Sequence, residues 1–113
     1  MELTKELVLE YLKTQSLMVL ATYGEEPWVA SVYYTFDSDL NLYYLSAPQT
    51  LHCLNIEKNP SVAAAIVDSN QNVNTLKRGI QLNGVAHQIS EAAKVRHALE
   101  LSPKANTLGL SRH

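Results

Sequence analysis

The stretch SLMVLATYGEEPWVASVYYTFDSDLNLYYLS, residues 16–46, decides the fold of this chain. Residues 16–22 form a mostly apolar segment that ends at the turn sequence Gly24-Glu25-Glu26-Pro27. Residues 28–36 are rich in β-branched and aromatic side chains, and Asp37-Ser38-Asp39 separates them from residues 42–46. Such segments, divided by turn residues, are typical of β-strands. The stretch therefore predicts a three-stranded antiparallel meander.

The sequence on either side of the meander predicts three helices and two more strands. The predicted helices are residues 4–13, capped by Thr4, a short one that begins at Thr50 and ends before Pro60, and residues 91–101. The predicted strands are residues 62–67, covered on both faces, and residues 79–89. We expect Leu51 and Leu54 to face inward, and the tail from about residue 103 to be irregular. The order α-β-β-β-α-β-β-α predicts one mainly β domain over residues 1–113, a small antiparallel split barrel with flanking helices.

Composition limits the classes of function. The chain has 113 residues, a formal net charge of -2 and a single cysteine. This balance gives no long-range attraction for nucleic acid or for an anionic membrane, so neither partner is expected. The apolar run at residues 17–21 is too short to span a bilayer, and the acidic opening Met1-Glu2-Leu3 does not resemble a secretory signal. We therefore predict a cytoplasmic protein.

The sequence contains none of the common nucleotide-binding or hydrolase motifs. The four glycines form neither GxGxxG nor a Walker loop, and there is no GxSxG elbow. Cys53 follows His52 directly, and adjacent helical residues diverge by about 100°, so the pair cannot hold one metal ion. The sequence predicts no metal site, and we interpret Cys53 as a packed thiol rather than a nucleophile.

Two places carry residues suited to a ligand. At Thr50, the free amides of a helix start, a hydroxyl and His52 could hold a phosphate group, although simple capping by Thr50 with a solvated His52 explains the same residues. The tyrosine pairs at 33–34 and 43–44 place a flat ring on each face of a sheet. These rings could stack on a planar ligand or serve only as cross-strand packing.

The ordered set of segments resembles the pyridoxamine 5'-phosphate oxidase-like flavin-binding split barrels over about residues 5 to 90. The segments that carry the resemblance are Leu20-Ala21-Thr22-Tyr23-Gly24-Glu25-Glu26-Pro27, Ala30-Ser31-Val32-Tyr33-Tyr34, Leu42-Tyr43-Tyr44-Leu45-Ser46, Thr50 through Asn59-Pro60 with Val62, and Arg78-Gly79-Ile80-Gln81-Leu82-Asn83-Gly84. Thr50-x-His52 and Asn106-Thr107-Leu108-Gly109 look closer to an uncharacterised bacterial branch, for which no reaction is implied.

The resemblance implies a homodimer that binds FMN at its interface. The implied contacts are Ser31, Val32 and Tyr33 along the isoalloxazine, Ser46 and Ala47 nearby, Thr50 and His52 at the phosphate, and Gln81 at a place from which family members can reach the flavin. The sequence departs from the family in two ways. His52 stands where many relatives carry lysine, and only residues 102–105 separate the last helix from residue 106, where relatives place one or two further strands.

Two hypotheses follow from the resemblance. The first is a homodimeric protein that binds FMN or a related flavin, with flavin-dependent oxidoreduction of an unidentified small molecule as its candidate activity. The second is a cofactor-free dimeric binding or interaction module built on the same fold. Pyridoxamine phosphate oxidation itself is the third and weakest reading, because no Arg and His cluster in the C-terminal part offers a second phosphate site.

Overall fold

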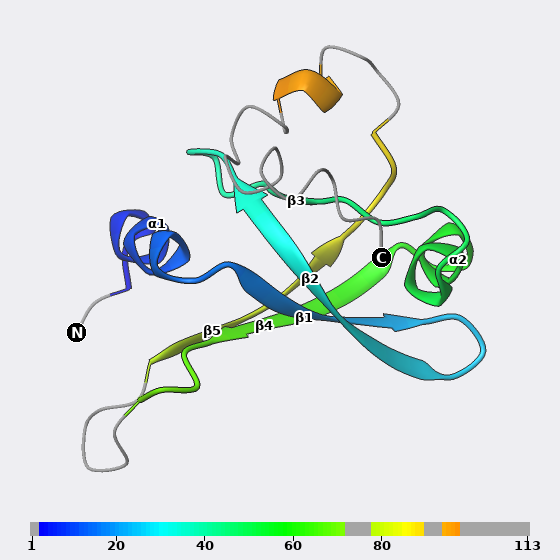
Figure 1. Ribbon diagram of the computed structural model, residues 1–113, viewed down its shortest axis with the longest axis horizontal. Coiled ribbons are helices and arrows are strands. Elements are labelled where there is room, and N and C mark those ends of the chain that lie inside the picture. Colours follow the sequence, from blue (N-terminus) through cyan, green and yellow to red (C-terminus); the bar gives the residue numbers. More distant parts are fainter. Residues whose placement is uncertain (1–2, 72–77, 90–93, 98–113) are drawn as a thin grey trace.

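The computed structural model describes residues 3–71, 78–89 and 94–97 (Figure 1). Its elements are α1 (Lys5–Thr14), β1 (Leu17–Tyr23), β2 (Pro27–Phe36), β3 (Leu42–Tyr44), α2 (Leu51–Lys58), β4 (Ser61–Val67) and β5 (Gly79–Val85), and residues 94–97 are helical. The predicted order of elements is thus confirmed. Most of the predicted last helix, the tail from residue 103 and the segment where relatives have extra strands lie outside the described residues.

The five strands form one antiparallel sheet in the order β3-β2-β1-β4-β5. The sheet is curled into half of a barrel, with α1 and α2 at opposite ends (Figure 1). Inward side chains alternate with outward ones along β1, β2 and β4, as the strand period requires. The buried core consists of Leu12, Met18, Leu20, Val32, Tyr34, Ala64 and Ile66. The mainly β split-barrel prediction is confirmed.

The first helix is fixed at both ends. The Thr4 hydroxyl accepts a hydrogen bond from the Leu7 amide at 3.2 Å, which confirms the predicted cap. On the core side, the buried Tyr34 hydroxyl donates to the Leu12 carbonyl at 2.7 Å. The Tyr11 hydroxyl donates to the carbonyl of Arg78 at 3.0 Å and accepts from the amide of Asp68 at 3.1 Å. These bonds tie α1 to β2 and to the segments that flank β4 and β5.

The second helix turns a different face inward from the one predicted. Leu51 and Leu54 are both more than two-fifths exposed, whereas His52 and Asn55 are buried. The reason is a polar partner on β1: the Asn55 side-chain amide donates to the hydroxyl of the buried Thr22 at 3.1 Å. The hydrogen bond to Thr22, together with the packing of Ile56 against the core, therefore sets the inward face of α2.

Other expectations about the strands also need correction. β3 ends at Tyr44 rather than at residue 46, and β5 ends at Val85 rather than at residue 89. The prediction that residues 62–67 are covered on both faces is wrong for the described chain, since Val67 of β4 is 58% exposed on the outward side. No helix of the described part lies over that side.

Candidate functional site

The corner between β3 and α2 brings together three polar side chains. The His52 Nε2 atom lies 2.8 Å from Ser46 Oγ and 3.4 Å from Thr50 Oγ1. The prediction that Thr50 caps α2 is wrong for its side chain, which turns back to the preceding turn, where its hydroxyl donates to the Ala47 carbonyl at 2.8 Å. No acidic residue stands in the first turn of α2. The corner thus offers the Ser46 hydroxyl, the imidazole of His52 and the amides of a helix start, beside a Thr50 hydroxyl that already donates to Ala47.

His52 is buried, with 6% of its surface exposed, so the alternative of a solvated His52 is wrong. Burial lowers the pKa of its imidazole from the ordinary 6.5. The ring of Tyr44 lies 6.2 Å from the imidazole, centroid to centroid. At neutral pH, His52 is therefore a neutral hydrogen-bonding group in the free protein, and not a standing positive charge.

The three implied contacts on β2 divide between the two faces of the sheet. Ser31 and Tyr33 point outward, and Val32 is buried in the core with 6% exposure. A ligand on the outer face can therefore meet only the backbone of Val32. Gln81 lies on the outer face as well, in a cross-strand row that runs Ser31–Val19–Ala65–Gln81. Three strand spacings, about 14 Å, separate the ends of this row.

Seven of the eight implied residues lie in one region. The β2–β3 pairing joins Tyr34 to Tyr44, and the same register continued places Ser46 and Ala47 beyond the end of β3 beside Val32 and Ser31. The corner of β3 and α2 therefore adjoins the middle of β2. Gln81 stands apart, on the far side of β1 and β4.

The outer face of the sheet has a property that the sequence analysis missed. None of the five strands contains an aspartate, glutamate, lysine or arginine, although 18% of the chain is charged. Large apolar side chains stand exposed there; they include Leu17, Val19, Val29, Tyr33 and Val67. A sheet face turned to water ordinarily carries polar and charged residues. Their absence from all strand segments is visible in the sequence and could have revealed this face.

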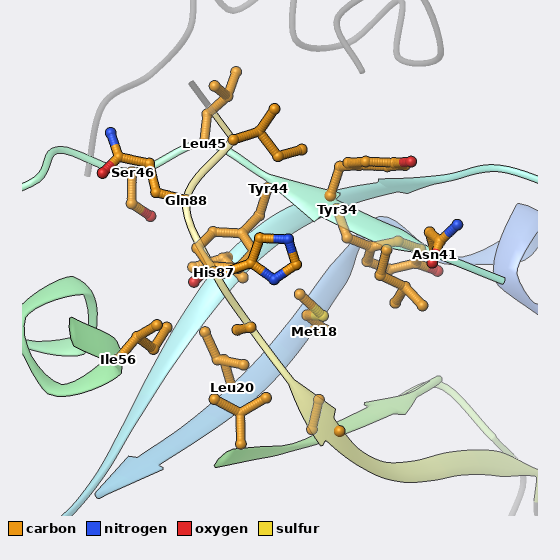
Figure 2. Close-up of a pocket in the computed structure, with 18 of the residues that line it drawn as sticks. Met18, Leu20, Tyr34, Asn41, Tyr44, Leu45, Ser46, Ile56, His87 and Gln88 are labelled. Carbon is orange, nitrogen blue, oxygen red and sulfur yellow. The ribbon is translucent and has the colours of Figure 1, made fainter. Parts of the chain in front are cut away.

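On the concave side, the sheet borders a cavity of about 1240 Å³, which the sequence did not predict (Figure 2). Its wall is formed by inward side chains such as Met18, Leu20 and Tyr44, and residues 86–89, 94–95 and 97 also line it. Ser31, Tyr33 and Ser46, which belong to the implied flavin contacts, line it as well. His87 points into the cavity in Figure 2. Among the described residues, no group of three or more His, Cys, Asp or Glu side chains could hold a metal ion. In the same residues, no helix is long and apolar enough to cross a membrane.

Solved structures of other proteins share this fold. HutZ, the heme storage protein from Vibrio cholerae, superposes with a TM-score of 0.77 at 18% identity, covering 100% of this chain and 84% of its own. A conserved hypothetical protein from Mycobacterium tuberculosis gives 0.75 at 15% identity, with 95% and 72% covered. A heme binding protein from Mycobacterium smegmatis gives 0.72 at 20% identity, with 95% of this chain but 47% of that protein covered. At these identities the likeness shows the fold alone.

A comparison with curated proteins gives no match. The family profile described as pyridoxamine 5'-phosphate oxidase matches residues 4–109, which is nearly the whole chain and contains the meander, the polar corner and β5. Together with the split-barrel sheet, this match shows that the chain belongs to the pyridoxamine 5'-phosphate oxidase family.

Proposed function

We propose that this chain forms a homodimer through the outer face of its sheet and binds FMN or a related flavin beside that face. The observation that carries the proposal is the uncharged outer face next to the corner of Ser46, Thr50 and His52. Contiguous exposed apolar surface marks an interaction site, and a two-fold axis lets one such surface cover itself. Membership of the family supports both parts of the proposal.

The residues at the corner suit the phosphate end of a flavin. Phosphate oxygens accept hydrogen bonds from hydroxyls, from imidazole N–H and from the free amides at a helix start. The first turn of α2 has neither a side-chain cap nor a carboxylate that would compete with the phosphate or repel it. The half-exposed ring of Tyr33 stands on the adjacent outer face and offers a surface for the isoalloxazine.

His52 makes the proposed affinity depend on pH. Burial lowers its pKa in the free protein, and a phosphate dianion beside it would raise that pKa in the complex. Binding then takes up a proton, so affinity should rise as the pH falls from the pKa of the complex to that of the free protein. Outside this pH range, His52 contributes no pH dependence to the flavin affinity. His52→Lys should flatten the slope and strengthen binding at pH 8, and His52→Ala should weaken binding more at pH 6 than at pH 8.

FMN fluorescence titrations of the three proteins at the two pH values test the role of the corner. Equal dissociation constants and equal pH slopes for wild type, His52→Lys and His52→Ala would contradict a phosphate contact at His52. Excess FMN should also raise the melting temperature by several degrees, since a ligand at 100 times its dissociation constant stabilises the folded state by about 2.7 kcal/mol.

Ala65→Lys tests the dimer, because it places a charge in the middle of the outer face. The matched control, Ser38→Lys, adds the same charge in the exposed β2–β3 turn. Sedimentation should give a dimer for wild type and Ser38→Lys and a monomer for Ala65→Lys, with flavin binding lost in the monomer. A wild-type monomer at micromolar concentration would refute the dimer.

The same titrations separate the competing functions. A dimer that stays colourless and gains no stability from FMN is the cofactor-free module. Two of the compared structures are described as heme proteins, so hemin is titrated in parallel. Saturable hemin binding without FMN binding would replace the flavin proposal.

Bound FMN would supply the redox chemistry, and this chain would supply binding and orientation. The proposed activity is oxidoreduction of a small molecule. Anaerobic bleaching of the bound flavin by NADH or NADPH tests whether the complex accepts electrons.

A further inference from the structure

The cavity on the concave side of the sheet is lined mainly by inward side chains of the strands, and it extends to Ser31, Tyr33 and Ser46 beside the β3–α2 corner. Its volume of about 1240 Å³ exceeds the 300–1,000 Å³ usual for small-molecule sites, and its wall is largely apolar (Figure 2). Met18 and Leu20 reach it from β1, Tyr44 from β3 and Ile56 from α2. Apolar ligand groups gain free energy when they move from water onto an apolar wall of this kind.

One polar group in this wall has no partner among the described residues. The Tyr44 hydroxyl makes no hydrogen bond there, although the side chain is more than half covered. Burial raises the pKa of Tyr44 to about 12, so the hydroxyl keeps its proton at neutral pH and can donate it to a ligand. The other buried tyrosine, Tyr34, already donates to the Leu12 carbonyl. Tyr44 is thus a hydrogen-bond donor available to a ligand beside an apolar wall.

The ionisable groups around the cavity favour an anion. His87 and His97 line it, with Glu57 as the carboxylate among the described lining residues. An imidazole N–H can donate a hydrogen bond to a negative ligand group, and a carboxylate is a stronger acceptor for a phenol than a neutral oxygen is.

We propose that the concave cavity binds a long-chain carboxylate, with its alkyl chain against Met18 and Leu20 and its carboxylate accepting a hydrogen bond from Tyr44. Ser31, Tyr33 and Ser46 of the proposed flavin site also line this cavity, so the two proposals are distinguished by their ligands. Tyr44→Phe should leave the FMN dissociation constant unchanged, and His52→Ala, which does not line the cavity, should leave the dye affinity unchanged.

The test uses the full chain and N-phenyl-1-naphthylamine, a neutral apolar dye whose fluorescence rises on transfer from water. We expect saturable binding, displaced by dodecanoic acid about tenfold more effectively than by dodecanol. Tyr44→Phe removes only the hydroxyl, so it should weaken displacement by the acid about tenfold and leave dye affinity unchanged.

Two neighbouring alanines of β4 give a matched pair for locating the dye. Ala64 faces the cavity and Ala63 faces outward. Ala64→Leu places a bulkier side chain in the cavity wall and should weaken the binding of both dye and acid, whereas Ala63→Leu should change neither affinity. Circular dichroism checks folding, and Leu82→Trp on β5 replaces Ala64→Leu if that variant is unfolded.

The proposal is overturned if the dye does not bind saturably. It is also overturned if dye affinity changes in Ala63→Leu and not in Ala64→Leu. Equal displacement by acid and alcohol, or an unchanged acid affinity in Tyr44→Phe, would also overturn the assigned carboxylate contact.

Discussion

Gly24 in the β1–β2 turn lies against the buried Asn55 of α2, and this contact predicts a large effect from a single methyl group. A Cβ on Gly24 would overlap the Asn55 Oδ1 atom and approach its Cγ atom to 3.0 Å. The Asn55 side chain has no free space to swing into, because it is 5% exposed and its amide donates to Thr22. Gly24→Ala therefore has to displace this side chain and break its hydrogen bond.

The size of the effect follows from the groups involved. Leaving a buried donor and acceptor without partners costs about 1–3 kcal/mol, and overpacking alone typically costs a similar amount. In the opposite direction, alanine reduces the conformational entropy of the unfolded chain, which stabilises the fold by about 0.4–1 kcal/mol. We expect Gly24→Ala to destabilise the fold by roughly 2–3 kcal/mol in the natural background. In an Asn55→Ala background the clash is absent, so the same change should be neutral or slightly stabilising.

Urea unfolding of the four proteins, followed by circular dichroism, gives the coupling free energy of the cycle. We expect a coupling of about 2 kcal/mol or more, well above the few tenths found for independent sites. An additive cycle, in which Gly24→Ala costs the same with and without the Asn55 side chain, would refute the reasoning. It would mean that the turn, rather than the contact with α2, requires glycine.

Three further predictions follow from individual groups. Because burial lowers the folded-state pKa of His52, the free protein should lose stability as the pH falls below about 6.5 towards that lower pKa. His52→Gln should remove this pH dependence of the free energy of unfolding, measured by urea titration at pH 5 to 8. Tyr34→Phe should destabilise the fold by about 1 kcal/mol in urea, since it leaves the Leu12 carbonyl without its donor; no change would show that water replaces the hydroxyl. Asp37→Ala should lower the free energy of unfolding by about 1–2 kcal/mol, because the carboxylate accepts hydrogen bonds from two backbone amides, the Asn41 side-chain amide and the Tyr43 hydroxyl. A loss of stability no larger than that of Ser38→Ala would contradict this role.

The elements and their order could be predicted because they depend on local patterns. Alternation along β1 and β2, the turns at residues 24–27 and 37–39, and the cap at Thr4 are properties of short segments. The inward face of α2 could not be predicted in this way. Leu51 and Leu54 were expected to face inward, but the inward Asn55 is held by Thr22, which is 33 positions away in the sequence. The absence of a cap at Thr50 has a related reason, because its side chain points back to the turn and donates to the Ala47 carbonyl instead of accepting from a helix amide.

The candidate site was predicted in outline because strand alternation and the family resemblance assign residues to a region. Alternation puts Val32 on the opposite face from Ser31 and Tyr33, but only the structure shows that Val32 is on the buried face and that His52 is buried beside Ser46. The concave cavity lay beyond sequence reasoning altogether, since its volume depends on how far the sheet curls and on where residues 86–89 run.

The distribution of charge links the two faces of the sheet. Every charged residue of the described chain lies on a helix, a turn or a loop, and none lies on a strand. Burial explains this on the concave side, where an unpaired charge would be strongly destabilising. It does not explain the outer face, where water would solvate a lysine or glutamate at little cost and charges would protect the sheet from association. An uncharged outer face is therefore better explained by a protein surface that covers it, and the apolar row around Val19 and Ala65 is where Ala65→Lys should act most strongly.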